Sequence, residues 1–199
     1  MLKKVKQSKS EKILLSFLVL LAFFSLSSFF IIKNKCLFVK DVNIKKINFN
    51  KPENISIMNI NCGDVVIELM PDISPNSVKR FKTLIKNREY DNIAFHRVID
   101  GFLVQAGDLE FGKKGSINYT YIGSGKSKYN LIKSEKDRPF DFKKGSVGFA
   151  KSKNGDMEDS EFFILLADAP LFEGEYTPLG KVTHGFAALT KIKSGNKSE

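Results

Sequence analysis

The sequence predicts a mainly β domain, an antiparallel barrel or sandwich, that follows one N-terminal hydrophobic helix. Three observations predict this fold class. Residues 13–32 carry no charged side chain. The rest of the chain holds many short strand patterns and only two helical ones. The 199 residues are 42% hydrophobic, which is enough for one domain with a packed core.

Composition argues against several classes of protein. Two cysteines and two histidines supply neither a disulfide-rich scaffold nor a Cys/His metal centre well. The net charge of +10 alone would suit a nucleic-acid-binding protein. The lysines are, however, distributed through every segment instead of being concentrated on one face. We therefore expect no nucleic-acid partner.

Residues 13–32 are the first predicted element, an apolar helix whose only polar members are serines. At ~1.5 Å per residue this helix measures roughly 30 Å, the thickness of a bilayer's hydrocarbon core. The lysine-rich residues 1–12 predict a basic cytoplasmic tail, because short basic flanks usually stay inside. The pattern therefore predicts a transmembrane signal anchor, with the following domain on the exported side, periplasmic or extracellular.

A cleaved signal peptide is the alternative interpretation of this segment, and it would give a secreted protein. Ser25-Leu26-Ser27 offers small residues at a plausible cleavage spacing after the apolar run 13–24. Against cleavage, residues 29–32 extend the apolar stretch to full spanning length. An uncleaved anchor is therefore the favoured interpretation.

Residues 33–53 mix lysine, asparagine and isolated apolar residues, and predict a linker that ends near Pro52. Cys36 lies in this linker and Cys62 lies early in the domain. Export would permit a bridge between the two cysteines, but nothing in the sequence demands one.

Short strands dominate residues 54–193, and residues 194–199 form a polar tail. Strands are expected at residues 55–57, 64–69, 94–99, 102–106, 146–150, 161–166 and 178–183. Asn61-Cys62-Gly63 predicts a hairpin turn between the first two. One helix is expected to begin with Ser74 as N-cap and Pro75 at its first position, and a shorter one near 185–192. Residues 109–143 predict long loops.

Two motifs suggest ligands but lack the required spacing. Gly123–Ser127 (GSGKS) resembles the end of a phosphate-binding loop, yet Thr120 stands where that pattern needs a glycine. Residues 154–159 (NGDMED) are acidic, but their carboxylates do not follow the spacing of a calcium-binding loop. These residues predict a solvated turn. We expect no metal site and no cofactor.

Residues 95–108 (FHRVIDGFLVQAGD) are the most informative segment, because they place two strands around an Asp-Gly turn. Arg97 and Gln105 lie eight residues apart, but the turn between them prevents parity from proving that they share a face. If the strands pair, a charged donor and an amide lie together beside Phe102 and Leu103. On these residues alone, an arginine among apolar groups is more often part of a structural ion pair.

The same segment resembles the cyclophilin signature FHRVI-x-GF-x-x-Q-x-GD and matches all ten of its fixed positions. Residues 145–164 and 171–182 are similar to two further family segments, in the same order and spacing, so the resemblance covers about residues 54–193. It implies a cyclophilin-like domain, a closed eight-stranded antiparallel barrel capped by two helices, closer to the bacterial members. It also implies peptidyl-prolyl cis-trans isomerase (rotamase) activity without a cofactor.

The resemblance implies a role for individual residues as well. Arg97 would be the catalytic residue, and His96 would support the fold. The substrate-binding positions would be Phe102, Leu103, Gln105, Ala150, Phe163, Leu171, Phe172 and Tyr176. The expected partners are proline-containing polypeptides, exported proteins that are still folding, and the expected state is a monomer.

Two of the departures from the family pattern change the charge near the expected pocket. Glu161 stands where the family usually has glutamine, and it could pair with Arg97 or with Lys151. A pair with Arg97 would compete with substrate for the guanidinium. Lys151 replaces a common asparagine and removes an acceptor for peptide. These departures keep open a second function, a proline-peptide binding module or chaperone with little turnover.

Overall fold

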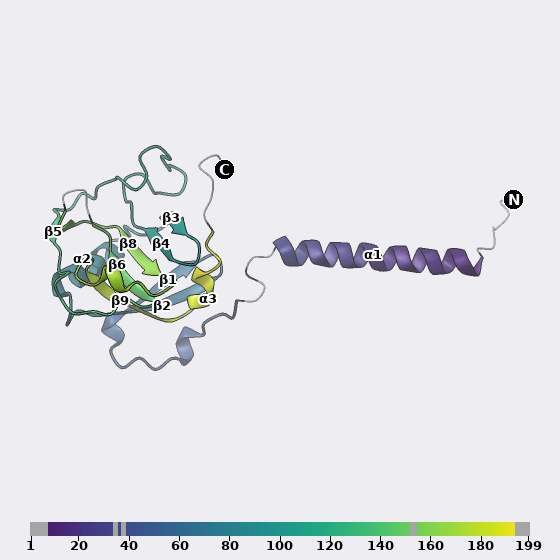
Figure 1. The fold of residues 1–199 in the computed structure, drawn as a ribbon, viewed down its shortest axis with the longest axis horizontal. Helices are drawn as coiled ribbons and strands as arrows, with labels where there is room; N and C mark the ends of the chain where they lie inside the picture. The colour runs from purple at the N-terminus through teal and green to yellow at the C-terminus, as the bar shows by residue number, and fades with distance from the viewer. Residues whose placement is uncertain (1–7, 34–35, 37–38, 152–154, 194–199) are drawn as a thin grey trace. The chain divides into compact units, whose positions relative to one another are not determined.

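The computed structural model describes residues 8–33, 36, 39–151 and 155–193 (Figure 1). The chain divides into two compact units, residues 1–38 and 39–199. The first contains the helix α1 (Lys9–Lys33). Residues Lys9–Phe29 of this helix are long and apolar enough to cross a membrane. The apolar helix predicted over 13–32 is therefore present, and it begins four residues earlier.

A seven-stranded antiparallel sheet forms the centre of the second unit, and each of the seven predicted strands is present in it (Figure 1). In spatial order the strands are β1 (Ile55–Ile60), β2 (Gly63–Leu69), β9 (Pro178–His184), β6 (Ser146–Phe149), β8 (Phe162–Leu165), β4 (Leu103–Ala106) and β3 (Phe95–Ile99). Strands β5 (Ile132–Lys133) and β7 (Met157–Glu158) were not predicted, and they pair only with each other.

The sheet is an open half-barrel, so the predicted closed barrel of eight strands is not found among the described residues. Strands β1 and β3 are its two edges. The segment that follows β4 does not add an eighth strand. It meets the residues just before β3 in one isolated bridge, between Ile93 and Lys113, and most of its other backbone hydrogen bonds are made within turns. Gly112 N–H donates to Asp108, for example, and Ser116 N–H donates to Lys113. The domain is a mainly β fold with helices against the sheet.

The helix α2 (Pro75–Lys86) begins where the sequence predicts, but its N-terminus is capped differently. The Ser74 hydroxyl makes no capping hydrogen bond. Instead the Glu135 carboxylate accepts the Ser77 N–H at 2.9 Å and the Asn76 side-chain amide at 3.1 Å. Free N–H groups at a helix start need an acceptor, and a carboxylate also suits the positive end of the helix dipole. A long-range contact therefore replaces the local cap.

The remaining helices are short. The second predicted helix, near 185–192, is limited to α3 (Phe186–Leu189). The described residues also contain three 3₁₀ turns: η1 (Ile44–Lys46), η2 (Pro52–Asn54) and η3 (Pro170–Phe172). Residues 39–53 belong to the second compact unit, and Val39 packs against its core. This part of the predicted linker is therefore attached to the domain.

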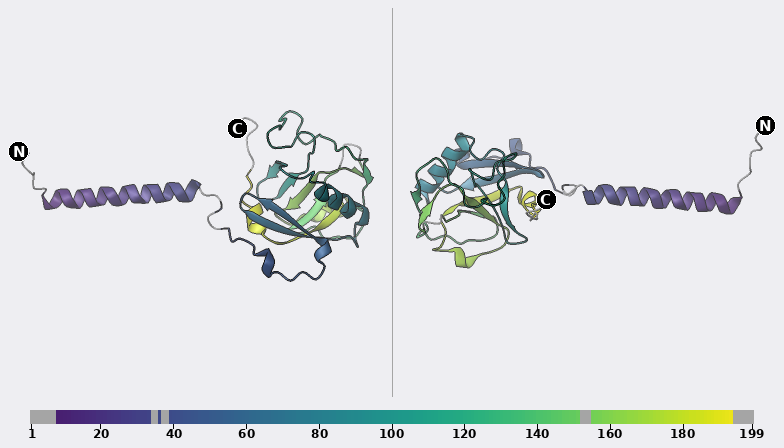
Figure 2. Two further views of the ribbon diagram at one scale, coloured as in Figure 1. Left: turned by 180° about the vertical axis from the view of Figure 1, so that it is seen from behind. Right: turned by 90° about the horizontal axis from the view of Figure 1, so that it is seen from above.

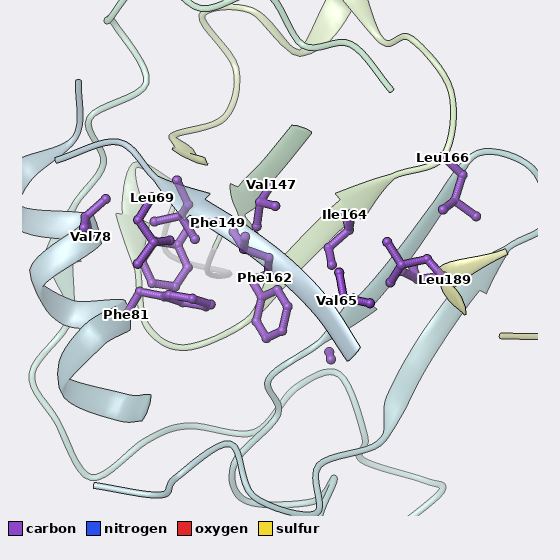
Figure 3. Packing of buried hydrophobic residues seen from close by; sticks show 14 of the residues in the cluster. Val65, Leu69, Val78, Phe81, Val147, Phe149, Phe162, Ile164, Leu166 and Leu189 are labelled. Carbon is purple, nitrogen blue, oxygen red and sulfur yellow. The ribbon is translucent and has the colours of Figure 1, made fainter. Parts of the chain in front are cut away.

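Alternation along the strands gives the sheet two different apolar faces, because successive side chains of a strand point to opposite sides. One face carries Val104, Phe162 and Ile164, and packs with α2 and α3 in the larger core (Figures 1 and 2). Figure 3 shows Phe81 of α2 beside Phe162, with ring centroids 5.2 Å apart. The other face carries the smaller cluster that contains Leu103, Phe163 and Leu165.

Candidate active site

A pocket of about 240 Å³ opens beside the smaller apolar cluster. It is lined by Arg97, Leu103, Gln105, Ala150, Lys151, Phe163, Phe172 and Tyr176. Ordinary small-molecule pockets measure ~300–1,000 Å³, so this one has room for a side chain or two of a peptide. Seven of these eight lining residues are ones that the sequence predicts as site residues.

Strand register explains why three polar and aromatic residues meet there. Arg97 on β3 lies directly opposite Gln105 on β4. Gln105 in turn lies opposite Phe163 on β8. Directly opposed residues of neighbouring strands share one face of a sheet. The register therefore settles what parity along the sequence left open: Arg97 and Gln105 lie on the same face, in one row with Phe163.

Aromatic rings form the apolar wall of the pocket. The Phe163 ring centroid lies 5.4 Å from that of Phe172 and 5.2 Å from that of Tyr176, both in edge-to-face contact. Phe163 is 2% exposed, so its ring is a fixed part of the fold. Gly148 on β6 makes room for it, because a Cβ at that position would lie 2.5 Å from Phe163 Cζ.

The Arg97 guanidinium lies on the polar side of the pocket and donates from Nη1 to Gln105 Oε1 at 3.3 Å. Among the described residues no carboxylate lies within 4.0 Å of this guanidinium. The pair of Arg97 with Glu161 that the sequence left possible is therefore not formed. Arg97 itself is exposed, so its remaining N–H groups are available to a ligand in the pocket.

Lys151 has a different carboxylate partner from the one the sequence suggested. Its Nζ lies 2.5 Å from Glu175 Oε2 and 5.1 Å from the centre of the Tyr176 ring. The hydrogen bond from Lys151 lowers the pKa of Glu175 below its ordinary range. Lys151 lines the pocket, although the sequence singled it out only as a departure from the family pattern. The signal that could have placed it is its position directly after Ala150.

Glu161 contacts the side chain of Gln105. Its Oε2 accepts a hydrogen bond of 2.6 Å from Gln105 Nε2. The same oxygen lies 3.4 Å from Nε2 of His96, whose side chain is only 4% exposed. This distance has the length of an ion pair, but the angle is not that of a hydrogen bond, and neither ring nitrogen of His96 has a hydrogen-bond partner.

Two predicted site residues lie outside the pocket lining. The Phe102 ring packs edge-on against Phe172, with centroids 5.8 Å apart, and so stands behind one wall. Leu171, in η3, is 87% exposed. Sequence similarity aligned both positions with the family's binding residues, but it could not show that their side chains would lie outside the pocket lining.

The GSGKS segment proves to be a binding loop for an internal carboxylate. Asp108 is completely buried. Its Oδ2 accepts the N–H groups of Gly123 at 2.6 Å and Gly125 at 3.1 Å. Successive backbone N–H groups form a concavity suited to anions, and here a side chain of the same domain occupies it. The N–H groups of Gly123 and Gly125 are thus already bonded within the domain.

Residue 154 of the predicted solvated turn at 154–159 lies outside the described residues, and Gly155 and Asp156 are exposed as the sequence predicts. The prediction is wrong for Glu158. Glu158 is 1% exposed and belongs to β7, while Asp156 forms an ion pair of 2.7 Å with Lys136. The carboxylates are thus directed to separate partners. Within the described part of the chain, no cluster of His, Cys, Asp or Glu could hold a metal ion.

Comparison with known families decides what this pocket belongs to. The model of the family "Cyclophilin type peptidyl-prolyl cis-trans isomerase/CLD" matches residues 55–199. The chain belongs to this cyclophilin family. The open half-barrel is accordingly the cyclophilin fold. The activity of this family is peptidyl-prolyl cis-trans isomerisation.

Bacterial cyclophilins are among the relatives. A probable peptidyl-prolyl cis-trans isomerase of Brucella suis is 41% identical over 150 residues, covering 74% of this chain and 76% of that protein. A peptidyl-prolyl cis-trans isomerase of Helicobacter pylori is 32% identical over 160 residues, covering 79% of this chain and 91% of that protein. The alignments therefore cover most of the length of these relatives.

Solved cyclophilin structures superpose on the same region. Cyclophilin AquaCyp293 from Hirschia baltica gives a TM-score of 0.61 at 19% identity, covering 72% of this chain and 69% of that chain. A cyclophilin from Cryptosporidium parvum, crystallised in the presence of the dipeptide Ala-Pro, gives 0.60 at 28% identity, covering 71% and 87%. The first comparison supports the cyclophilin fold alone.

Proposed function

We propose that this cyclophilin accelerates rotation about X-Pro bonds in exported proteins during folding, with Arg97 as the catalytic residue. The observation that carries the proposal is the position of the Arg97 guanidinium. It lines a pocket with aromatic walls, and no described carboxylate neutralises it. An arginine locked in an ion pair would have supported the binding-module alternative instead.

The chemistry follows from the amide bond. Rotation about a peptide bond meets a barrier of ~18–20 kcal/mol, because the nitrogen lone pair is delocalised into the carbonyl. In the twisted state the lone pair is localised on nitrogen, and it becomes a hydrogen-bond acceptor. A guanidinium is always charged and presents several donors from a rigid plane. Donation to that nitrogen stabilises the twisted state more than either planar state, which lowers the barrier.

The pocket residues would hold the substrate while it rotates. Phe163, Phe172 and Tyr176 would grip the proline ring, and Leu103 would close the apolar side of the pocket. Gln105 and Ala150 would contact peptide backbone. Phe102 would support Phe172 from behind, and Leu171 would meet only a longer peptide, because it lies outside the lining. With the ring held, the residue before proline is the part that turns.

Isomerisation of an Ala-Pro peptide by the full chain in mild detergent tests the activity and its residue. We expect Arg97→Ala to lower kcat/KM by about 100-fold, a loss of ~2.7 kcal/mol in transition-state stabilisation. Arg138→Ala removes an exposed arginine elsewhere in the domain and should leave the rate unchanged. A wild-type chain that binds the peptide without accelerating its isomerisation would establish the binding module instead.

We also propose that the domain lies on the exported side of a membrane. The division would be a basic cytoplasmic tail at 1–12, a signal anchor at 13–32, a linker at 33–53, the isomerase domain at 54–193 and a polar tail at 194–199. The apolar helix supports the anchor. Both cysteines are disulfide-bonded, and disulfides persist in oxidising compartments such as the periplasm. The domain would act as a monomer.

Two measurements on intact cells test this location. Protease added outside the cytoplasmic membrane should digest the domain, and a thiol reagent without reductant should label neither cysteine in the denatured chain. Labelling of both cysteines would contradict export. The mass of the mature chain separates the two forms of export: full length means an anchor, and loss of about the first 27 residues means a cleaved signal.

A further inference from the structure

The Gln105 side chain stands between a group that can only donate hydrogen bonds and one that can only accept them. Its Oε1 accepts from the Arg97 guanidinium at 3.3 Å, and its Nε2 donates to the Glu161 carboxylate at 2.6 Å. A guanidinium has no acceptor, and an ionised carboxylate has no donor. Only one orientation of the Gln105 amide satisfies both neighbours, because a flipped amide would set N–H against N–H and oxygen against oxygen.

We propose that Glu161 is a positioning residue that fixes the orientation of the Gln105 amide and, through it, holds the Arg97 guanidinium over the pocket. The inference rests on the catalytic role proposed for Arg97. It differs from both pairings that the sequence left open, with Arg97 and with Lys151. Glu161 is not in the pocket lining and acts from behind Gln105.

This arrangement gives a physical reason for glutamate at 161, where the family usually has glutamine. A glutamine at 161 could either donate to or accept from Gln105, so it would impose no orientation on that amide, and Arg97 alone would do so. The carboxylate adds a second neighbour that accepts only one orientation. A hydrogen bond to an ionised acceptor is also roughly twice as strong as one between neutral groups. The substitution therefore trades an adaptable contact for a directed one.

The groups around Glu161 leave its carboxylate free to bond Gln105. Its side chain is 17% exposed, and the nearest other charged candidate is His96 on β3, at 3.4 Å. Lys151, the second partner that the sequence suggested, is held by Glu175. Among the described residues, the Gln105 amide is therefore the group that the Glu161 carboxylate contacts with hydrogen-bond geometry.

The test compares two substitutions at 161 with a matched control in the full chain. Glu161→Gln keeps an acceptor but loses the charge, and we expect kcat/KM to fall about threefold. Glu161→Leu loses the acceptor, and we expect a fall of about tenfold. Glu89→Gln is the control. Glu89 has a similarly covered side chain, 18% exposed, and it pairs with Lys128 at 2.6 Å, away from the pocket. This control should leave kcat/KM unchanged.

A double-mutant cycle distinguishes positioning through Gln105 from a merely structural role. In a Gln105→Leu background, Glu161→Leu should have no further effect on kcat/KM. The side-chain amide signal of Gln105 in a ¹⁵N NMR spectrum should show one strongly deshielded proton in the wild type and in Glu89→Gln. That deshielding should be lost in Glu161→Leu.

The outcomes separate this inference from the proposed function. If Glu161→Leu lowers the rate equally in both backgrounds, or leaves the Gln105 signal in place, the positioning role is wrong while the role of Arg97 stands. If Arg97→Ala retains full activity, the proposed function itself fails, whatever Glu161 does. Thermal unfolding of each variant shows whether it is folded, and the NMR readout does not depend on activity.

Discussion

Arg97 and Gln105 face each other directly across β3 and β4, and their side chains are joined by a hydrogen bond of 3.3 Å. Both belong to the same row as Phe163 on β8. Arg97, Gln105 and Phe163 are thus held by paired strands, which fix side chains more precisely than loops do. The sheet sets the distance between the guanidinium and the Phe163 ring, while Phe172 comes from η3 and Tyr176 from the bend before β9.

Because Phe172 belongs to the aromatic wall and Leu171 does not, we expect substitutions at these two residues to change peptide affinity by different amounts. Phe172→Leu removes a ring that contacts Phe163, Phe142 and Tyr176, and we expect the Kd of a short proline peptide to weaken about tenfold, or ~1.4 kcal/mol. Leu171→Ala alters a side chain that is 87% exposed and outside the lining. Its effect on the same Kd should stay below about twofold. Isothermal titration checks both, and a larger loss from Leu171→Ala would move the binding surface outward.

Asp108 predicts a stability effect without a direct effect on chemistry. Its buried carboxylate accepts four backbone N–H groups, those of Glu110, Phe111, Gly123 and Gly125. Asp108→Asn turns an NH₂ group toward some of these donors, which should destabilise the fold by about 2–4 kcal/mol in denaturant unfolding. The control Asp141→Asn breaks an exposed ion pair, and it should cost less than about 0.5 kcal/mol. Equal losses would mean that Asp108 does not organise the loop.

Glu158 predicts how stability depends on pH. Burial raises the pKa of this carboxyl above its ordinary 4.5, although Ser77 donates to it at 3.0 Å. The folded state therefore binds the proton more tightly than the unfolded state, and stability decreases as pH rises from about 4.5 through the raised pKa. Glu158→Gln removes this decrease. The free energy of unfolding of the variant, relative to the wild type, should increase between about pH 4.5 and pH 8.

At Glu175 we expect stability to depend on pH in the opposite direction, because the hydrogen bond from Lys151 lowers the pKa of this carboxyl. Its contribution to stability is present above about pH 4.5 and is lost as the pH falls. Glu175→Gln should therefore reduce the acid-dependent part of the unfolding free energy, by a small amount because the pair is exposed. A common direction for both variants would contradict the assignment of the two shifts.

The strands of the sheet could be predicted because each is a short apolar or alternating run bounded by turn residues. The extent of closure could not, since the segment after β4 contains apolar residues and yet reaches the residues before β3 only through the isolated bridge of Ile93 with Lys113. Most of its other hydrogen bonds are made in turns near Asp108. Strands β5 and β7 have two residues each and no pattern of their own. The cap of α2 was missed because Glu135 lies more than fifty residues away from Ser77.

Much of the site could be predicted through resemblance, and its charge pairing could not. The ten signature positions identify Arg97 and Gln105, but they do not say which carboxylate meets which cation. That choice depends on rotamers and strand register: Glu161 contacts Gln105, and Glu175 contacts Lys151. Local sequence contains no signal for such pairs, because their partners come from different strands and turns.

Binding and turnover measured side by side in Arg97→Ala test the role of the guanidinium. The guanidinium is proposed to stabilise the twisted amide, whereas the aromatic pocket holds the planar peptide equally well without it. With the full chain and one Ala-Pro peptide, we expect the cis-trans exchange rate at saturation to fall about 100-fold while Kd changes less than about threefold. An unchanged rate, or a loss of affinity as large as the loss of rate, would contradict this role.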